Sequence, residues 1–495
     1  MTIDEAKVQI KDTVIAYSER DQYGDHLIPS QSQRPVFLMG PPGIGKTAIM
    51  AEIANELDIN LLSYSMTHHT RQSTLGLPII KTKEYGGEET SVTEYTMSEI
   101  IASVYDEMEA TGNRAGILFL DEMNCVSETL TPTMLQFLQY KTFGRHALPD
   151  GWVVVAAGNP PEYNRSAREF DMVTWDRLKR IDIDPDYLSW RKYAVSVGVH
   201  PAVLSYLDIN RSAFYSLRRG EDGHGLVTAR GWTDLSNILL VYEKKGLAAN
   251  RNLIVQYLQD AAIADSFADY YMLFKKYDSD YRIQEILSGA VLQEIIERAS
   301  AAPFDERLSL LELMLGKIRE AASAFFERRS VLEELHPYLK AVKAGEPMQK
   351  QIEEEKSRLS KSRRRGGLSP QRRVVMNFTI AFLERNAGKD FSAIKESFES
   401  LRTETTTCAK AVSDKLAAIF SFCDLCWGEG QEMVILLSDL TADPLLSMFV
   451  ARYGCDAYYK HSEVLMFNQR RNDIERAVTA LQKKEQVAVN YDDLV

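Results

Sequence analysis

Cysteine is scarce in this sequence, and long hydrophobic runs are absent. The chain has five cysteines among 495 residues, an odd and sparse set that is typical of a protein whose thiols stay reduced. No apolar run approaches the roughly 20 residues that a membrane span needs. The segment 1–12 carries three acids and no apolar core, so we do not expect a secretory signal. These absences favour a cytoplasmic protein without a membrane segment.

Basic residues are also in the minority. The chain has 58 Lys and Arg against 70 Asp and Glu, a formal net charge of -12. This balance argues against broad, nonspecific nucleic-acid binding as the main activity. The segment 356–373 is a local exception, with eight basic residues and no acid. We interpret it as a loop or linker between helices, with binding of an acidic partner or nucleic acid as the alternative.

The pattern of short apolar runs indicates the fold class. A chain of this length needs two or three domains. Between residues 31 and 185, short apolar runs alternate with helical patterns, which predicts a parallel sheet covered by helices on both faces. We expect a helix and linker over 1–30 and helices over 186–265 and 266–495. The five predicted strands lie at 35–39, 61–65, 116–120, 153–157 and 181–183.

The strongest motif follows the first predicted strand and opens a helix. It fits the phosphate-loop pattern of a glycine, four residues and then Gly-Lys-Thr. Glycines let backbone N–H groups turn toward phosphates, and the helix N-terminus adds a favourable dipole. We expect Lys46 to neutralise the β and γ phosphates of ATP and Thr47 to hold Mg²⁺. The predicted nucleotide-binding residues are Gly40, Pro41, Pro42, Gly43, Ile44, Gly45, Lys46, Thr47 and Ala48.

A second motif is the apolar run Gly116–Leu120, which ends in Asp121 and Glu122. A carboxylate at the C-terminal end of a parallel strand lies in the crevice where ligands bind in such sheets. We expect Asp121 to hold Mg²⁺, directly or through water. Glu122 is expected to orient and polarise the attacking water. The two motifs together predict ATP hydrolysis.

With these motifs the sequence resembles AAA+ ATPases of the MoxR group, within a bacterial subfamily that has a long helical C-terminal region. The resemblance implies a P-loop NTPase core with a five-stranded parallel sheet over 31–185. It also implies a small α-helical lid over 186–265 and a large all-α domain over 266–495. Asn159 matches the polar residue called sensor 1, and Arg230 matches the arginine called sensor 2, both of which contact the γ-phosphate in that family.

The resemblance also covers one arginine and two inserted segments. Arg177, in Asp176-Arg177-Leu178, matches the arginine finger that reaches the γ-phosphate of the neighbouring subunit, and Arg180 is the alternative. A finger supplied in trans couples hydrolysis to assembly. The segments 81–96 and 137–152 resemble the insert in helix 2 and the hairpin before sensor 1.

The resemblance implies a hexameric ring that hydrolyses ATP and remodels or activates a protein client, with a von Willebrand A domain protein as partner. A nucleic-acid-directed motor or restriction-type NTPase is the alternative, favoured by Lys141, Arg145 and His146 near the predicted hairpin. A nucleotide-gated scaffold without hydrolysis is a third interpretation, against which Glu122 and Arg177 argue.

Overall fold

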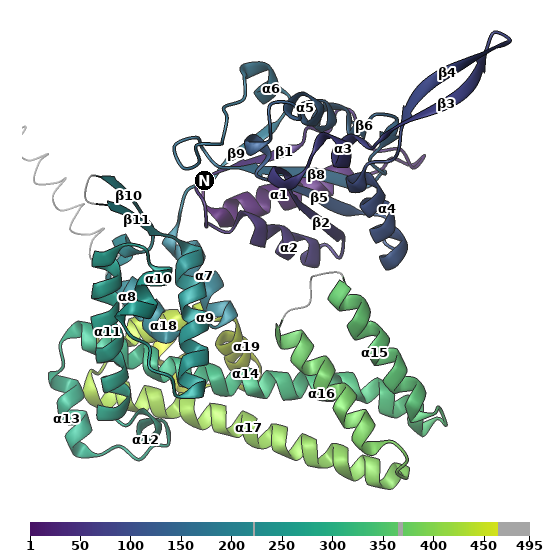
Figure 1. The fold of residues 1–495 in the computed structure, drawn as a ribbon. Coiled ribbons are helices and arrows are strands. Elements are labelled where there is room, and N and C mark those ends of the chain that lie inside the picture. Colours follow the sequence, from purple (N-terminus) through teal and green to yellow (C-terminus); the bar gives the residue numbers. More distant parts are fainter. Residues whose placement is uncertain (221–222, 365–369, 464–495) are drawn as a thin grey trace, which may run out of the picture. The chain divides into compact units, whose positions relative to one another are not determined.

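The computed structural model describes residues 1–220, 223–364 and 370–463 (Figure 1). The chain divides into two compact units. The first unit comprises residues 1–190, 214–234 and 347–387, and the second comprises 191–213, 235–346 and the chain from 388 onward. The lid expected over 186–265 is therefore shared between the two units.

A five-stranded parallel sheet forms the centre of the first unit. Its strand order is β2-β5-β8-β1-β9, and each neighbouring pair runs parallel. All five strands fall where the apolar runs predict them, so the predicted fold class is confirmed. The strands are β1 (Val36–Met39), β2 (Asn60–Ser65), β5 (Gly116–Asp121), β8 (Trp152–Gly158) and β9 (Lys179–Asp182).

Helices cover both faces of this sheet (Figure 1). On β1, Val36 and Leu38 pack into the layer that contains α1 and α2, while Phe37 and Met39 pack into the layer that contains α4 and α5. This alternation follows from the two-residue period of a strand. Both faces are buried, which explains why the strands read as continuous apolar runs. The helices of this part are α1 (Ile3–Ser18), α2 (Lys46–Glu56), α3 (Arg71–Leu75), α4 (Glu99–Thr111), α5 (Thr131–Tyr140) and α6 (Met172–Asp176), with 3₁₀ turns η1 (Met66–His68) and η2 (Met123–Cys125). Helix α7 (Tyr187–Val197) begins in the first unit, but most of its residues belong to the second.

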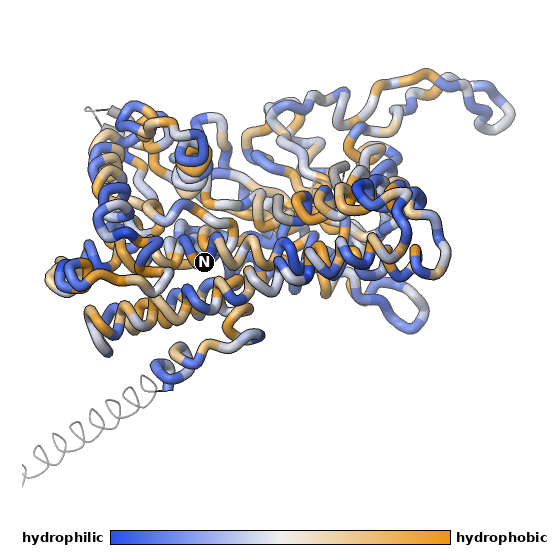
Figure 2. The backbone as a smooth tube through the Cα atoms, turned by 90° about the horizontal axis from the view of Figure 1, so that it is seen from below, coloured by the Kyte–Doolittle hydropathy of each residue, from blue (hydrophilic) through white to orange (hydrophobic). Residues whose placement is uncertain are grey.

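Two antiparallel hairpins extend from this core. The first pairs β3 (Pro78–Tyr85) with β4 (Glu88–Tyr95), and Figure 1 shows it reaching well beyond the sheet. Its tip is hydrophilic in Figure 2. The second pairs β6 (Thr142–Phe143) with β7 (His146–Ala147), and it lies within the predicted hairpin segment 137–152, the first part of which is the end of α5.

The structure corrects two sequence predictions. The segment 186–265 is not wholly helical, because β10 (Ser216–Gly220) and β11 (Gly223–Val227) form a hairpin inside it. Much of the segment predicted as a loop at 356–373 is helical, since α15 (Met348–Arg364) and α16 (Pro370–Asn386) extend into it. Its residues 365–369 lie outside the described residues. Lysine and arginine are good helix formers, so a basic run alone does not break a helix.

The second unit is helical in its described part, as the sequence predicts for the C-terminal region. Its two longest helices, α14 (Phe304–Lys343) and α17 (Phe391–Cys426), pack against each other. Among the described residues no single helix is both long and apolar enough to span a membrane. The pair α18 (Gln431–Ala442) and α19 (Pro444–Tyr453), bent by 91°, meets the same length and composition criteria together. The remaining elements are α8 (Pro201–Ile209), η3 (Arg211–Ala213), the greater part of α9 (Ala229–Lys245), α10 (Arg251–Tyr257), α11 (Ala261–Asp280), α12 (Ile283–Leu287) and α13 (Gln293–Ala301).

A buried charge cluster joins four segments of the second unit. The Arg191 guanidinium lies 2.8 Å from an Asp208 oxygen, 3.1 Å from a Glu312 oxygen and 3.0 Å from an Asp439 oxygen. Burial, with the neighbouring Asp439 carboxylate, raises the pKa of Glu312 from 4.5 to about 8. Three acids around one arginine therefore leave a carboxyl that holds its proton near neutral pH.

We expect Glu312→Gln to reduce the pH dependence of the second unit's stability. The native Glu312 binds a proton that the unfolded chain releases, so the free energy of unfolding falls as pH rises from about 4.5 to about 8. Replacement by neutral glutamine should remove about 1–3 kcal/mol of this fall, measured as thermal melts at pH 5 and pH 8. The exposed Glu333→Gln on the same helix is the control. If stability changes equally between pH 5 and pH 8 in the two variants, the raised pKa of Glu312 is wrong.

Candidate functional site

The phosphate-loop segment connects β1 to α2 in a tight turn. Gly43 and Gly45 have φ angles of 74° and 99°, in the left-handed region that favours glycine. A Cβ atom at Gly43 would also lie 2.8 Å from the Thr228 side chain. The loop conformation therefore requires these glycines, and Lys46, Thr47 and Ala48 begin the helix.

Lys46 is buried at the centre of the site. Its Nζ donates hydrogen bonds to the Gly40 carbonyl at 2.7 Å, to the Pro41 carbonyl at 2.8 Å and to Asn159 Oδ1 at 2.8 Å. All three acceptors are neutral. Burial lowers the pKa of Lys46 to about 8, while Asp121 and Glu122 act in the opposite direction and Arg230 in the same one. A bound anion would relieve this desolvated ammonium.

Thr47 and Asp121 meet although 74 residues separate them. Thr47 Oγ1 donates to Asp121 Oδ2 at 2.9 Å. The hydroxyl and the carboxylate are hard oxygen donors at the C-terminal edge of the sheet, a set that suits Mg²⁺ with water and phosphate oxygens completing its shell. The two predicted metal ligands are thus adjacent.

Glu122 adopts an uncommon backbone conformation beside Asp121. Its φ is 55°, and the left-handed region is rare for a residue that is not glycine. Its carboxylate accepts hydrogen bonds from Ser65 Oγ at 2.8 Å and Thr67 Oγ1 at 3.1 Å. Ser65 ends β2, the strand next to β5. Two hydroxyls from a neighbouring strand end therefore fix this carboxylate.

A second asparagine positions Asn159. Asn124 is buried, and its Nδ2 donates to the Asn159 carbonyl at 2.8 Å. A Cβ at Gly158 would lie 2.4 Å from Asn124 Oδ1, so only glycine permits this approach. Asn124 therefore sets the end of β8, and with it the direction from which Asn159 reaches Lys46.

The two candidate finger arginines differ in their contacts. Arg180 pairs with Asp182, with its Nε 2.8 Å from a carboxylate oxygen, and lies over the Trp175 ring at 4.6 Å. Arg177 follows the last residue of α6 and is exposed. Within the described residues its side chain makes no hydrogen bond or ion pair. Hydrogen bonds from Thr174 lower the pKa of Asp171, and the charge of Arg177 acts in the same direction. The structure therefore leaves Arg177 available to an outside ligand.

Residues 214–234 bring further side chains to the phosphate loop. The Arg230 backbone N–H donates to the Gly43 carbonyl at 3.1 Å, and the arginine's charge acts on Lys46. Tyr215 donates its hydroxyl proton to the Pro42 carbonyl at 2.8 Å. Arg230 thus lies next to the loop through its backbone, and its role toward the γ-phosphate stays a prediction. No sequence motif marks Tyr215.

The comparisons with known proteins agree with this geometry. A family profile described as AAA domain (dynein-related subfamily) matches residues 35–178, the segment that contains the loop, the acid pair and Asn159. Residues 35–178 form an AAA domain. This domain holds a phosphate loop, a lysine and an acid pair in one site, the groups that ATP hydrolysis requires. The family profile leaves the MoxR assignment open.

Solved structures add a weaker likeness. A candidate ATPase from Cytophaga hutchinsonii is 18% identical over 39% of this chain and 55% of that one, with a TM-score of 0.23. PCH-2 from C. elegans is 12% identical over 54% of this chain and 66% of that one, with a TM-score of 0.26. Both TM-scores are too low to support a comparison of fold or function. The search among curated proteins found no match.

Four residues of the AAA-domain site were not predicted from the sequence, namely Ser65, Thr67, Asn124 and Tyr215. Each is a common polar residue outside the two motifs, and each contacts a predicted site residue that is distant in sequence. The dipeptide Asp121-Glu122 was visible as a motif. The hydroxyls that hold Glu122 lie 57 and 55 residues away, and no local pattern marks them.

Proposed function

We propose that this chain is a ring-forming AAA+ ATPase that remodels or activates a protein client. In the proposed reaction Lys46 neutralises the β and γ phosphates, and Asn159 and Arg230 contact the γ-phosphate. Thr47 and Asp121 would hold Mg²⁺, which supplies charge neutralisation on the phosphate oxygens. Glu122 orients the attacking water and accepts its proton.

The contacts of Glu122 suggest how this carboxylate is oriented. Ser65 and Thr67 both donate to the same oxygen, Oε2. A carboxylate has two acceptor oxygens, so the two hydroxyls hold the side chain in place while Oε1 remains available to a water.

Ring formation rests on the exposed Arg177. A guanidinium without an ion-pair partner, at the end of α6, is available to stabilise charge on a phosphate in another subunit. The hexamer expected from the resemblance is part of this proposal. The cytoplasmic location stays a prediction from the sequence.

We expect Arg177→Ala to lower ATP turnover by about 10³-fold or more, the scale of a finger arginine, while ATP binding remains. Mixing this variant with the inactive Glu122→Gln should restore part of the activity, because some interfaces then combine an intact glutamate with an intact arginine. Steady-state phosphate release measures both effects. Arg180→Ala is the matched comparison, since its guanidinium is already paired with Asp182. If Arg180→Ala behaves like Arg177→Ala, or if mixed rings stay inactive, the trans assignment is wrong.

A protein client is favoured by the β3–β4 hairpin. Ile80 is 80% exposed and Tyr85 is 57% exposed. Both residues lie on β3 of this projecting hairpin. Exposed apolar side chains on a projecting hairpin are typical of a contact with protein. This is the observation that carries the client proposal. The von Willebrand A domain partner follows from the resemblance only.

The three side chains that favoured the nucleic-acid alternative already have partners within the protein. Lys141 is buried and donates to Gln33, and Arg145 pairs with Glu94. His146 Nε2 lies 3.5 Å from the Tyr95 carbonyl. A phosphate backbone needs exposed and unpaired cations. None of these three residues offers one.

The decisive experiment captures what binds the ATP-loaded enzyme. Glu122→Gln, held in ATP, would be purified from native extract, and its co-purifying molecules identified by mass spectrometry and nucleic-acid staining. The proposal expects a protein that is absent when Ile80 and Tyr85 are both replaced by Ser, with the exposed Tyr105→Ser as the control. Nuclease-sensitive DNA or RNA without a protein would establish the nucleic-acid motor. Hydrolysis absent under every condition would favour the scaffold.

A further inference from the structure

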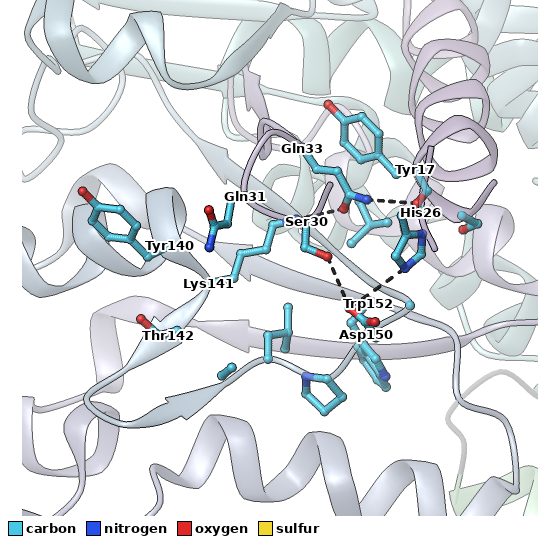
Figure 3. Close-up of a pocket in the computed structure, with 16 residues that line it drawn as sticks. Tyr17, His26, Ser30, Gln31, Gln33, Tyr140, Lys141, Thr142, Asp150 and Trp152 are labelled. Atoms are coloured by element: carbon cyan, nitrogen blue, oxygen red, sulfur yellow. Dashed lines mark hydrogen bonds and ion pairs between the residues drawn. The ribbon is translucent and has the colours of Figure 1, made fainter. Parts of the chain in front are cut away.

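A cavity lies at the edge of the sheet opposite the phosphate loop (Figure 3). Its volume is about 230 Å³. Trp152 begins β8 and Gln33 precedes β1, so the cavity is at the N-terminal edge of these parallel strands. The phosphate loop and Asn159 follow the same two strands at the C-terminal edge. The cavity is thus separate from the ATP site, and nothing in the proposed reaction uses it.

Lys141 supplies a buried positive charge to this cavity. The residue is 7% exposed, and its Nζ donates one hydrogen bond, to Gln33 Oε1 at 2.9 Å. Gln33 Nε2 is fixed by the Tyr17 and Ile28 carbonyls at 3.0 Å and 2.9 Å, so Gln33 presents its oxygen to the lysine. Burial lowers the pKa of Lys141 to about 8, although Asp150 acts in the opposite direction. An ammonium has three donors, and the described residues accept from one.

Lys141 also holds an uncommon backbone conformation. Its φ is 55°, in the left-handed region, where it ends α5 and leads directly into β6. Such conformations are unfavourable for residues other than glycine. The structure retains this conformation, and it places a charged side chain in the cavity at the base of the β6–β7 hairpin.

Two further cavity-lining residues, His26 and Trp152, have buried nitrogen atoms. The Arg20 guanidinium lies 3.2 Å from His26 Nε2, and because a guanidinium only donates, Nε2 accepts and Nδ1 carries the hydrogen. Among the described residues, His26 Nδ1 and Trp152 Nε1 have no hydrogen-bond partner. An indole N–H can only donate. Both nitrogens are buried and closed off from the cavity space, and His26 Nε2 also lies 4.0 Å from Asp150 Oδ1. Lys141 is therefore the buried charge beside the cavity.

The charge balance indicates which acceptor fits. Asp150 is the acid among the lining residues, and its side chain is 67% exposed and accepts from Ser30 Oγ at 3.2 Å. It would repel a doubly charged phosphate more than a singly charged group. We infer that this cavity binds a carboxylate, held by Lys141. The carboxylate belongs either to a small free acid or to an acidic side chain of another protein.

The test follows the signal of Trp152 in protein labelled with 5-fluorotryptophan. The chain has five tryptophans, and Trp152→Phe assigns the relevant ¹⁹F resonance. One arm titrates sodium acetate and sodium glutamate at constant ionic strength, balanced with chloride. The other arm titrates a blocked tetraglutamate peptide, whose carboxylates are all on side chains. A saturable shift is expected in at least one arm, and the arm that responds identifies the source.

Matched variants decide whether the cavity is responsible. Lys141→Met should weaken the response about tenfold or more, the scale of a charge-assisted hydrogen bond. Lys179→Met should leave it unchanged, because Lys179 Nζ also binds a neutral oxygen, Thr13 Oγ1, but outside the cavity. If Lys141→Met fails to fold, Ala147→Phe at the exposed rim should block the response instead.

Two results would overturn the inference. One is the absence of a saturable Trp152 shift with acetate, glutamate and the peptide alike. The other is a shift that survives unchanged in Lys141→Met or in Ala147→Phe. The measurement contains no nucleotide, so its failure would leave the proposed ATPase reaction and its client untouched.

Discussion

Lys46→Met is expected to abolish detectable ATP hydrolysis, with a loss on the order of 10²-fold or more. The variant keeps the length of the side chain and removes the charge that faces the phosphates. Among the described residues this ammonium donates hydrogen bonds to the neutral oxygens of Gly40, Pro41 and Asn159. Its replacement therefore does not leave a hydrogen-bonded carboxylate without its partner. Binding of ATP, measured by calorimetry, should weaken along with turnover.

The stability of this variant separates function from folding. Burial of an ammonium among neutral groups is unfavourable, as the lowered pKa of Lys46 indicates. Lys46→Met should therefore melt no lower than the wild type at pH 7. Lys179→Met is the control, because it removes a lysine of the same unit that lies outside the site. Tight ATP binding by Lys46→Met would refute the phosphate-loop assignment.

Glu122→Gln is expected to bind ATP normally and to lose turnover by about 10²–10⁴-fold, the usual contribution of a general base. The amide keeps the shape of the side chain and can still accept from Ser65 and Thr67 through its oxygen. It cannot take a proton from water. Nucleotide affinity and single-turnover phosphate release, measured on the same sample, distinguish these two effects.

Glu128→Gln is the matched control for Glu122→Gln. Glu128 lies a few residues further along the chain, is 80% exposed at its side chain and pairs with Arg168. Its replacement should change turnover less than about twofold, since a surface ion pair contributes little. If Glu122→Gln retains wild-type turnover, then another residue acts on the water. In that case Ser65 and Thr67 would hold a structural carboxylate.

The resemblance and the structure differ most over what surrounds the motifs. The sequence predicted the inserted segments 81–96 and 137–152 and two candidate finger arginines. It did not predict that Glu94 binds Lys81 and Arg145, which removes Arg145 from the nucleic-acid alternative. It also kept Arg180 as the alternative to Arg177, whereas in the described structure Arg180 is already engaged by the Asp182 carboxylate and the Trp175 ring. Such distinctions depend on which charges meet in space.

The sequence by itself determined the sheet, the phosphate loop and the acid pair. These features are local, because a strand buried on both faces must be a continuous apolar run and a loop around phosphates must place glycines and lysine at fixed spacing. Only the tertiary structure decided the partners of Glu122, the approach of Tyr215 to Pro42 across 173 residues and the cavity at Lys141. Those contacts join chemically ordinary residues from distant segments, so their meaning arises only when packing brings the segments together.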